Sequence, residues 1–491
     1  MRPKSATQAL RLVPSRTMPP PAPRLPSLSR FARAAALLVT TLTLAGSCAS
    51  LPPNPINNAA LATPPATIPG TPGPTSDEAI GLAFSGGGAR AAAFSYGVML
   101  GLAEARTPDG QSRLNSIAFI TAVSGGSFTA SWFGLHGPEG LHGFREALLH
   151  KNWQGAARTS LLSPANWIGA VQGGVNGPRE IAGWLDREVF KGARLSDMRG
   201  PPILLNAADL RAGVPFTFAA PWFEALCSDL GSVRVADAVA AASAYPLGIK
   251  PVPLEAYPET CSSASLPWAE RLLADPGTST MARATAATMA GYHAGTGGRY
   301  LHLLDGGMVD NFGLTGLSIQ HEASGLPYGP LLTAESAVRL RRLRMIVVNA
   351  EQIGGPAPAD EPRGPGGASL IQAVAGHTVD AAKYHAYDAF AGKLEQWQEE
   401  TVAWRCALPP AEAKRLGAPE GWDCADLTFT VQMIGFADLP PARAARLGNL
   451  PTRLSLPAAD IDLAIEAGRD LALERTRLWT TPEPQLLAAP L

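Results

Sequence analysis

The stretch IAFITAVSGGSFTAS, residues 117–131, decides the fold predicted for this chain. Its first half is apolar and β-branched, as in a buried strand, and small and apolar residues follow the pair Gly125-Gly126 at helical spacing. The pattern predicts a strand, a sharp turn and a helix, with Ser124 in a strained conformation at the turn. The Ser124 hydroxyl would stand beside a helix N-terminus, whose unpaired N–H groups favour negative charge.

This turn approximates the nucleophile elbow G-x-S-x-G, with Ala122 in place of the first glycine. An ordinary glycine-containing turn explains an isolated S-G-G equally well. The choice therefore depends on two other segments, one upstream and one downstream.

The upstream segment is SGGGAR, residues 85–90, between an apolar run that predicts a strand and a helical pattern over residues 90–105. Consecutive glycines leave N–H groups free to point at one anionic oxygen, either of a bound phosphate or of a reaction intermediate. The dinucleotide fingerprint requires Ala91 in place of its last glycine, and no Lys-Ser/Thr follows as in a P-loop. An oxyanion hole fits better, because a candidate nucleophile is present.

The downstream segment is LLDGG, residues 303–307, which places Asp305 at the end of a short apolar strand. Alone, such an acid is more often a capping group. In an α/β sheet, however, strand ends converge where ligands bind, so Asp305 and Ser124 can meet there. As an alternating strand residue, His302 is predicted to be a structural, hydrogen-bonding histidine rather than a third catalytic residue.

The whole pattern predicts an α/β protein, a three-layer α/β/α sandwich with a mainly parallel central sheet. Two long irregular segments, residues 138–175 and 251–299, are interpreted as surface elaboration, with a lid or substrate mouth as the alternative. The other predicted core strands are residues 202–207, 344–348 and 429–436, and the later helices are residues 369–400 and 458–479.

Three blocks, GGGAR at residue 86, VSGGS at residue 123 and DGGMVDN at residue 305, resemble the signature blocks of patatin-like phospholipases, in that order. The resemblance extends over residues 80–479 and includes the segments at 206–210, 238–246 and 466–469. It implies a patatin-like fold with a helical C-terminal extension, and a serine acyl hydrolase with a Ser-Asp dyad that needs no catalytic histidine, cofactor or metal.

Carried onto this chain, the resemblance makes Ser124 the nucleophile, Asp305 the base, and the backbone of Gly86, Gly87 and Gly88 the oxyanion hole. Gly125 and Arg90 are auxiliary. Arg90 is interpreted as orienting the glycine loop or attracting a phosphate head group, with a solvated helix-end arginine as the alternative. Asp310 and Asn311 are predicted to shape the loop after Asp305, and Asp209, in the segment at 206–210, is predicted to be structural.

The expected reaction is hydrolysis of phospholipid or lysophospholipid acyl esters through an acyl-serine intermediate. The alternatives are a general esterase or thioesterase acting on soluble esters, and a non-catalytic lipid-binding envelope protein. Forty basic against 41 acidic residues leave a formal net charge of −1, so no positive field indicates nucleic acid.

The N-terminus is a separate region, because seven basic residues precede the first acidic residue, Asp77. Residues 34–46 form an uncharged apolar run of 13 residues, the size of a signal-peptide core. The following LAGSC resembles a bacterial lipoprotein signal with Cys48 as the lipidated residue; plain secretory cleavage is the alternative. Residues 51–76 contain eight prolines and no charge, which predicts an extended tether.

These features predict four regions: a signal peptide (1–47), a lipid-anchored linker (48–77), a catalytic core (78–355) and a C-terminal helical extension packed on the core (356–491). The protein would be exported, as a lipoprotein on the outer membrane or periplasmic face, and otherwise periplasmic or secreted. The remaining four cysteines permit disulfides Cys227–Cys261 and Cys406–Cys424, with buried free thiols as the alternative.

Overall fold

Eight strands form a mixed central sheet in the described part of the chain, in the order β10-β9-β1-β2-β4-β8-β7, with the short β5 paired to β4. The neighbours from β10 to β4 run parallel, whereas β5, β7 and β8 run antiparallel to their partners. The strands are β1 (Glu78–Phe84), β2 (Ile117–Val123), β4 (Ile203–Asp209), β5 (Pro215–Thr217), β7 (Val252–Glu255), β8 (Tyr300–Asp305), β9 (Arg342–Asn349) and β10 (Thr428–Gly435).

The structure is a computed structural model that describes residues 54–59, 76–151, 174–261, 263, 265–352 and 367–479. The predicted signal peptide, Cys48 and most of the linker lie outside these residues. No helix within the described residues combines the length and apolarity needed to cross a membrane. A second, two-stranded sheet pairs β3 (Gly174–Asn176) with β6 (Leu247–Ile249).

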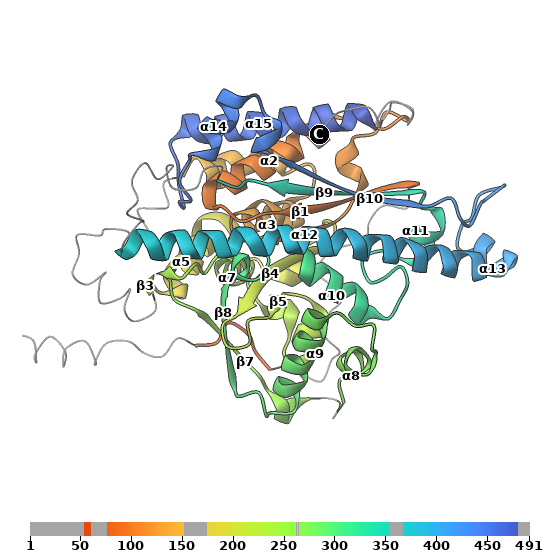
Figure 1. Cartoon of the computed structure of the whole chain (residues 1–491), viewed down its shortest axis with the longest axis horizontal. Helices are drawn as coiled ribbons and strands as arrows, with labels where there is room; N and C mark the ends of the chain where they lie inside the picture. Colours follow the sequence, from red (N-terminus) through yellow and green to blue (C-terminus); the bar gives the residue numbers. More distant parts are fainter. Residues whose placement is uncertain are drawn as a thin grey trace, which may run out of the picture. The chain divides into compact units, whose positions relative to one another are not determined.

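Helices cover both faces of the sheet (Figure 1). On one face α2 packs against α15 and α3, and small residues permit the close contact: a Cβ at Gly97 would lie 2.1 Å from the carbonyl oxygen of Ile465. On the other face α12 packs with α10, and Trp397 of α12 stacks on Phe119 of β2. The helices are α2 (Gly88–Glu104), α3 (Gly125–His136), α5 (Pro178–Leu185), α6 (Ala220–Ala225), α7 (Val235–Ala242), α8 (Pro267–Ala274), α9 (Thr280–His293), α10 (Leu314–Ser324), α11 (Ala334–Arg339), α12 (Gly367–Ala407), α13 (Pro410–Arg415), α14 (Pro441–Gly448) and α15 (Ala458–Leu478).

The predicted three-layer sandwich with a mainly parallel sheet is confirmed. Strands β1, β2 and β4 are buried along their whole length, as their apolar sequences require. One expectation differs from the structure: residues 251–299, predicted to be irregular, contain β7, α8 and α9. The strand predicted over residues 429–436 is confirmed as β10, so the C-terminal extension contributes a strand as well as helices.

Part of the predicted tether is docked on the domain. The Ile56 N–H donates to the Pro253 carbonyl of β7 at 3.2 Å. The Asn57 side chain is buried, and its amide donates to the Glu255 carbonyl while its oxygen accepts from the Glu255 N–H, each at 2.9 Å. Residues 54–59 therefore cover the outer edge of β7, in contrast to the extended tether predicted for them.

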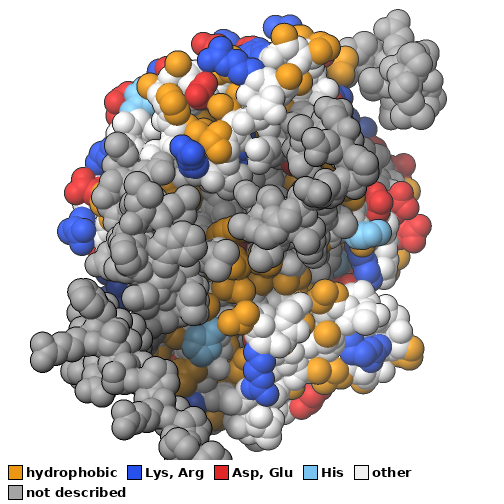
Figure 2. All heavy atoms as spheres, turned by 60° about the vertical axis from the view of Figure 1, so that its left-hand side comes forward, with side chains coloured by type: hydrophobic (Ala, Val, Ile, Leu, Met, Phe, Trp, Pro, Cys, Tyr) orange, Lys and Arg blue, Asp and Glu red, His pale blue; other side chains and the backbone are white. Residues whose placement is uncertain are grey.

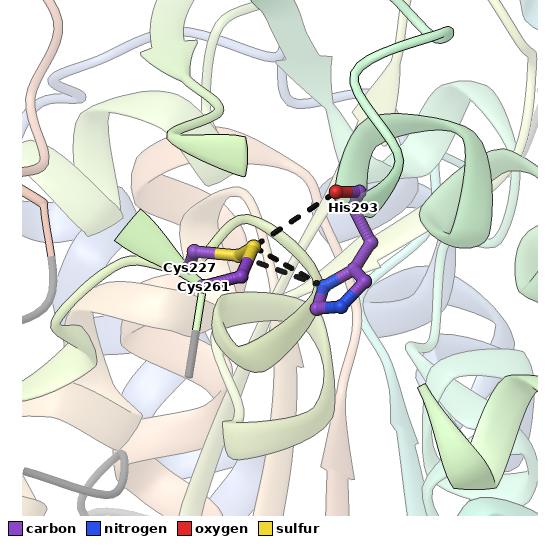
Figure 3. A group of neighbouring side chains, drawn as sticks. All are labelled: Cys227, Cys261 and His293. Atoms are coloured by element: carbon purple, nitrogen blue, oxygen red, sulfur yellow. Dashed lines mark hydrogen bonds between the residues drawn. A yellow bond between two sulfur atoms is a disulfide. The ribbon is translucent and has the colours of Figure 1, made fainter. Parts of the chain in front are cut away.

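Both predicted disulfides, Cys227–Cys261 and Cys406–Cys424, are present. The imidazole of His293 faces the first one (Figure 3), with Nδ1 at 3.5 Å from Sγ of Cys227 and 3.6 Å from Sγ of Cys261. Among the described residues this is the one cluster of three potential metal-binding side chains. Because its two sulfurs are bonded to each other, they are not free to coordinate a metal.

Candidate active site

Ser124 occupies the strained turn that its sequence predicts. It joins β2 to α3 with φ 46° and ψ −121°, a backbone conformation that residues other than glycine rarely adopt. Glycine is required next to it, because a Cβ at Gly125 would lie 2.2 Å from the carbonyl oxygen of Gly88. The elbow and the glycine loop are therefore in direct contact.

The register of β4 brings Asp305 to Ser124. Asn206 of β4 pairs with both β2 and β5, and the next residue, Ala207, pairs with both β5 and β8. Because a strand residue has one neighbour on each side, β5 occupies one side of β4, and β2 and β8 share the other. These two strands meet end to end there, with Val123 opposite Asn206 and Asp305 opposite Ala207. The residue after Val123 is Ser124, which is thereby placed next to Asp305.

The end of α7 and the residues after it hold the backbones of both Ser124 and Asp305. The Ser124 N–H donates to the carbonyl of Ala242, and the Asp305 N–H donates to the carbonyl of Ala244, each at 3.0 Å. Two positions of one short segment thus fix the backbones of the candidate nucleophile and base. This segment lies within residues 238–246, which entered the sequence-based prediction only as a point of resemblance, with no role.

The carboxylate of Asp305 is buried and has few hydrogen-bond donors. Burial raises its pKa to about 6, against the opposing effects of the Ser124 hydroxyl and the Gly307 N–H, which lower it. The Gly307 N–H donates to Oδ1 at 2.9 Å. A carboxylate with this pKa is ionised at neutral pH and accepts a proton more readily than an exposed aspartate does.

The glycine loop offers two N–H groups beside the nucleophile. Gly87 and Gly88 have positive φ values of 136° and 62°, and their N–H groups have no hydrogen-bond partner among the described residues. The N–H of Gly86 instead donates to the backbone and side-chain oxygens of Asn311, at 3.2 and 3.1 Å. The loop lies against the elbow, since a Cβ at Gly86 would be 3.2 Å from that of Ser124.

Arg90 is neither solvated nor open to a phosphate, in contrast to two of the roles considered for it. Its side chain is buried, and its guanidinium donates to the carbonyl of Ala350 at 2.8 Å, to the carbonyl of Leu450, and to the hydroxyl of Thr452 at 3.3 Å. Burial lowers its pKa to about 10. Arg90 therefore holds the start of α2 to the end of β9 and to a C-terminal segment, which agrees with a role in orienting the loop.

The loop after Asp305 has the local hydrogen bonds that were predicted. Asp310 accepts from the N–H groups of Phe312 at 2.9 Å and Thr315 at 2.5 Å, which caps the start of α10. Asn311 goes beyond the prediction, because it reaches across to Gly86.

Asp209 and His302 both lie outside the reactive cluster. Asp209 accepts from the N–H groups of Arg211 and Ala212 and from the Tyr292 hydroxyl, so its predicted structural role is confirmed. His302 alternates with the buried Asp305 along β8 and is exposed, which excludes a triad. The prediction that its side chain makes a structural hydrogen bond was wrong, because that side chain has no hydrogen-bond partner among the described residues.

The buried side-chain amide of Asn206 lies where β2 and β8 meet along β4. The Asn206 side chain donates to the Thr121 hydroxyl at 2.8 Å and to the Ala122 carbonyl at 3.2 Å, and it accepts from the Thr217 hydroxyl at 2.9 Å. A Cβ at Gly316 of α10 would lie 2.3 Å from its oxygen, so that helix leaves room for it. No role was predicted for Asn206 from the sequence, since these partners lie on two other strands, β2 and β5.

An elbow serine, a buried carboxylate and free N–H groups on a glycine loop, gathered at one edge of an α/β/α sandwich, form the arrangement found in serine hydrolases. Residues 82–317 match the family model described as Patatin-like phospholipase. The resemblance noted in the sequence is therefore confirmed over these residues, and the match supports a lipid acyl hydrolase in general.

Among solved structures, the chain is similar to one described as human GIVD cytosolic phospholipase A2, at 13% sequence identity and a TM-score of 0.33. The match covers 82% of this chain and 62% of the human chain. A comparison with curated proteins gives no match.

Proposed function

We propose that this domain hydrolyses acyl esters of phospholipids or lysophospholipids through an acyl-serine intermediate, with Ser124 as nucleophile and Asp305 as base. The observation that carries the proposal is the end-to-end meeting of β2 and β8 along β4, which sets the elbow serine beside a buried carboxylate.

In the first half-reaction, Oγ of Ser124 attacks the ester carbonyl carbon while its proton passes to Asp305. The carbonyl oxygen becomes an oxyanion, which the N–H groups of Gly87 and Gly88 stabilise, with that of Gly125 at the start of α3 as a further donor. Collapse of this intermediate breaks the ester bond, and the protonated Asp305 returns its proton to the departing lysophospholipid or glycerol oxygen.

In the second half-reaction, a water molecule attacks the acyl-serine and gives its proton to Asp305. The free fatty acid leaves, and the proton returns to Oγ of Ser124. A pKa of about 6 suits both steps, because the carboxylate is ionised at neutral pH and still takes up a proton at low cost.

Lipid rather than soluble ester is favoured by the surface around the site. Figure 2 brings forward the side on which β9 ends, and hydrophobic side chains gather near the middle of that face. Tyr245, which follows the Ala244 contact to Asp305, is 49% exposed; Tyr384, whose hydroxyl contacts Glu351 just beyond β9, is 53% exposed. Such amphipathic rings suit a boundary between water and lipid.

We also propose that the protein is exported and anchored through a lipid on Cys48, on the strength of the N-terminal sequence. The test follows labelled palmitate incorporation and membrane fractionation for the wild type and Cys48→Ala. Loss of both signals in the variant is expected; unchanged labelling would refute the anchor.

The activity test measures fatty-acid release from mixed phospholipid and lysophospholipid micelles, with and without EDTA, for the wild type, Ser124→Ala and Asp305→Ala. Release that survives EDTA and is lost in both variants is expected. A serine-reactive fluorophosphonate probe provides the control. Labelling without lipid hydrolysis would indicate a soluble ester as substrate, and no labelling of the folded protein would indicate a non-catalytic lipid-binding protein.

A further inference from the structure

A C-terminal segment, residues 450–453, lies directly against the glycine loop. The N–H of Ala89 donates to the carbonyl of Arg453 at 2.8 Å, and a Cβ at Gly88 would lie only 2.3 Å from that carbonyl oxygen. Arg90 fixes the same segment through Leu450 and Thr452. The backbone of Arg453 is thus held beside Gly88, one of the two glycines whose N–H groups are unpaired.

The side chain of Arg453 differs from those of the arginines around it. It is exposed, and within the described residues it has no hydrogen bond, ion pair or aromatic contact. Four of the five arginines in the flanking helices α14 and α15 pair with an acid: Arg443 with Asp470, Arg446 with Asp460, Arg469 with Glu104 and Arg475 with Asp438. Among the described residues, Arg453 is therefore a cation without a counter-charge, held at the border of the site by its backbone.

The substrate classes considered for this site differ mainly in one group. A phospholipid carries a phosphate a few bonds from its acyl esters, whereas a diacylglycerol or simple ester is neutral there. Arginine binds phosphate oxygens through two parallel N–H groups, which gives both affinity and orientation. Arg90, the basic residue closest to the glycine loop in sequence, is buried against carbonyl groups and cannot supply this contact.

We propose that Arg453 binds the phosphate of a phospholipid whose acyl ester is positioned at Ser124, so that the C-terminal extension selects phospholipids over neutral acyl esters. This inference rests on the proposed function. It assigns Arg90 the role of holding the segment, and Arg453 the role of contacting the substrate.

The experiment uses the full chain and four forms: wild type, Arg453→Gln, Arg453→Lys, and Arg446→Gln as the matched control from the same region. Each is assayed on a phospholipid and on a diacylglycerol with identical acyl chains, presented in the same detergent micelles, and on p-nitrophenyl butyrate. Arg453→Gln should lower kcat/KM for the phospholipid roughly ten- to a hundredfold, as expected for loss of a charged hydrogen bond. The other two substrates should be hydrolysed as by the wild type.

Arg453→Lys should recover part of the phospholipid activity, and Arg446→Gln should leave all three rates unchanged. An equal loss on all substrates would mean that Arg453 only supports the loop, and no loss would mean that it does not contact the phosphate; either result overturns the inference while leaving the proposed function standing. A wild type that hydrolyses the neutral esters and neither the phospholipid nor the matching lysophospholipid refutes both.

A further arm separates a lipid phosphate from a free anion. Inorganic phosphate is titrated into the p-nitrophenyl butyrate assay of the wild type and Arg453→Gln. Weak or no inhibition of the wild type, together with the selective loss on phospholipid, supports the inference. Strong inhibition that disappears in Arg453→Gln, with an unchanged ratio of phospholipid to diacylglycerol hydrolysis, would assign the residue to a free anion and overturn it.

Discussion

Asp305 and Asp310 are two buried carboxylates in one loop, and they differ in what surrounds them. Asp310 accepts from N–H groups of the following loop and of α10, including those of Phe312 and Thr315. Asp305 has one backbone donor, Gly307, and the Ser124 hydroxyl. Burial raises the pKa of both. The difference indicates that a buried carboxylate is structural when fixed backbone donors surround it, and reactive when one of its donors carries the proton to be moved.

The largest expected effect is on catalysis. Asp305→Asn removes the base and should lower kcat/KM for ester hydrolysis by about 10²- to 10⁴-fold. Asp310→Asn, the same chemical change five positions later, should retain most of the activity per folded molecule. Initial rates normalised to folded protein, determined by circular dichroism, provide the check. Comparable losses in the two variants would contradict the distinction.

The same pair should have opposite effects on stability. At pH 7 the ionised Asp305 is buried with a pKa of about 6 instead of 3.8, which costs up to about 3 kcal/mol of folding free energy. Asp305→Asn should therefore raise the free energy of unfolding, measured by urea denaturation at constant m-value. A fall in stability would show that the charge is better compensated than its environment indicates.

Asp310→Asn should lower the free energy of unfolding by about 1–3 kcal/mol, because it turns an amide N–H₂ toward N–H groups that now donate to a carboxylate. The Thr315 N–H, at 2.5 Å, is one of these donors. The measurement is the same urea titration. A stabilised Asp310→Asn would mean that relief of the buried charge, which already raises the pKa of Asp310, outweighs the loss of its backbone hydrogen bonds.

The pH dependence of activity follows from the raised pKa of Asp305. The base must be ionised, so kcat/KM should fall about tenfold per pH unit below pH 6. The stability of the wild type should rise as its activity falls. Because the folded-state pKa of Asp305 lies above 3.8, the folded protein takes up the proton before the unfolded chain does, so the difference in unfolding free energy between the wild type and Asp305→Asn should shrink as the pH falls from 6 towards 4. A kcat/KM that stays flat down to pH 5 would exclude Asp305 as the base.

The smallest expected effect isolates the Ser124 hydroxyl. Ser124→Ala removes a donor that lowers the pKa of Asp305, so that pKa should rise above about 6 while that of Asp310 stays unchanged. Infrared titration of the carboxyl band, with Asp305→Asn to assign it, measures the shift. An unchanged Asp305 band would mean that the hydroxyl does not donate to this carboxylate in solution.

Local sequence was sufficient for the elements that carry the motif blocks, but not for β7, α8 and α9, and it was insufficient for the contacts between elements. The strand, turn and helix around Ser124 follow from an apolar run and two glycines within 15 residues, so periodicity and turn chemistry predicted them. Strand β8 joins the sheet antiparallel to β4 through the pairing of Ala207 with Asp305. These residues are 98 positions apart, so no local sequence pattern contains this pairing.

The candidate site was predicted to the same extent. The three motif blocks indicated Ser124, Asp305 and the glycine loop, because each block is recognisable from its own short run of residues. The burial of Arg90 could not be predicted, since its partners, Ala350 and Leu450, come from the end of β9 and from a segment some 360 residues away. The contact of Asn311 with Gly86 is of the same kind.

The docking of residues 54–59 has a consequence for where the folded unit begins. The Asn57 amide satisfies both peptide groups of Glu255, as an additional strand would, and the Ile56 N–H satisfies Pro253. A chain shortened to begin at residue 78 would leave this edge of β7 with unpaired peptide groups, and exposed strand edges recruit other chains. Residues 54–59 thus cover an edge that is otherwise open to pairing with another chain, and a shortened protein that keeps this edge covered starts at or before Asn54 rather than at β1.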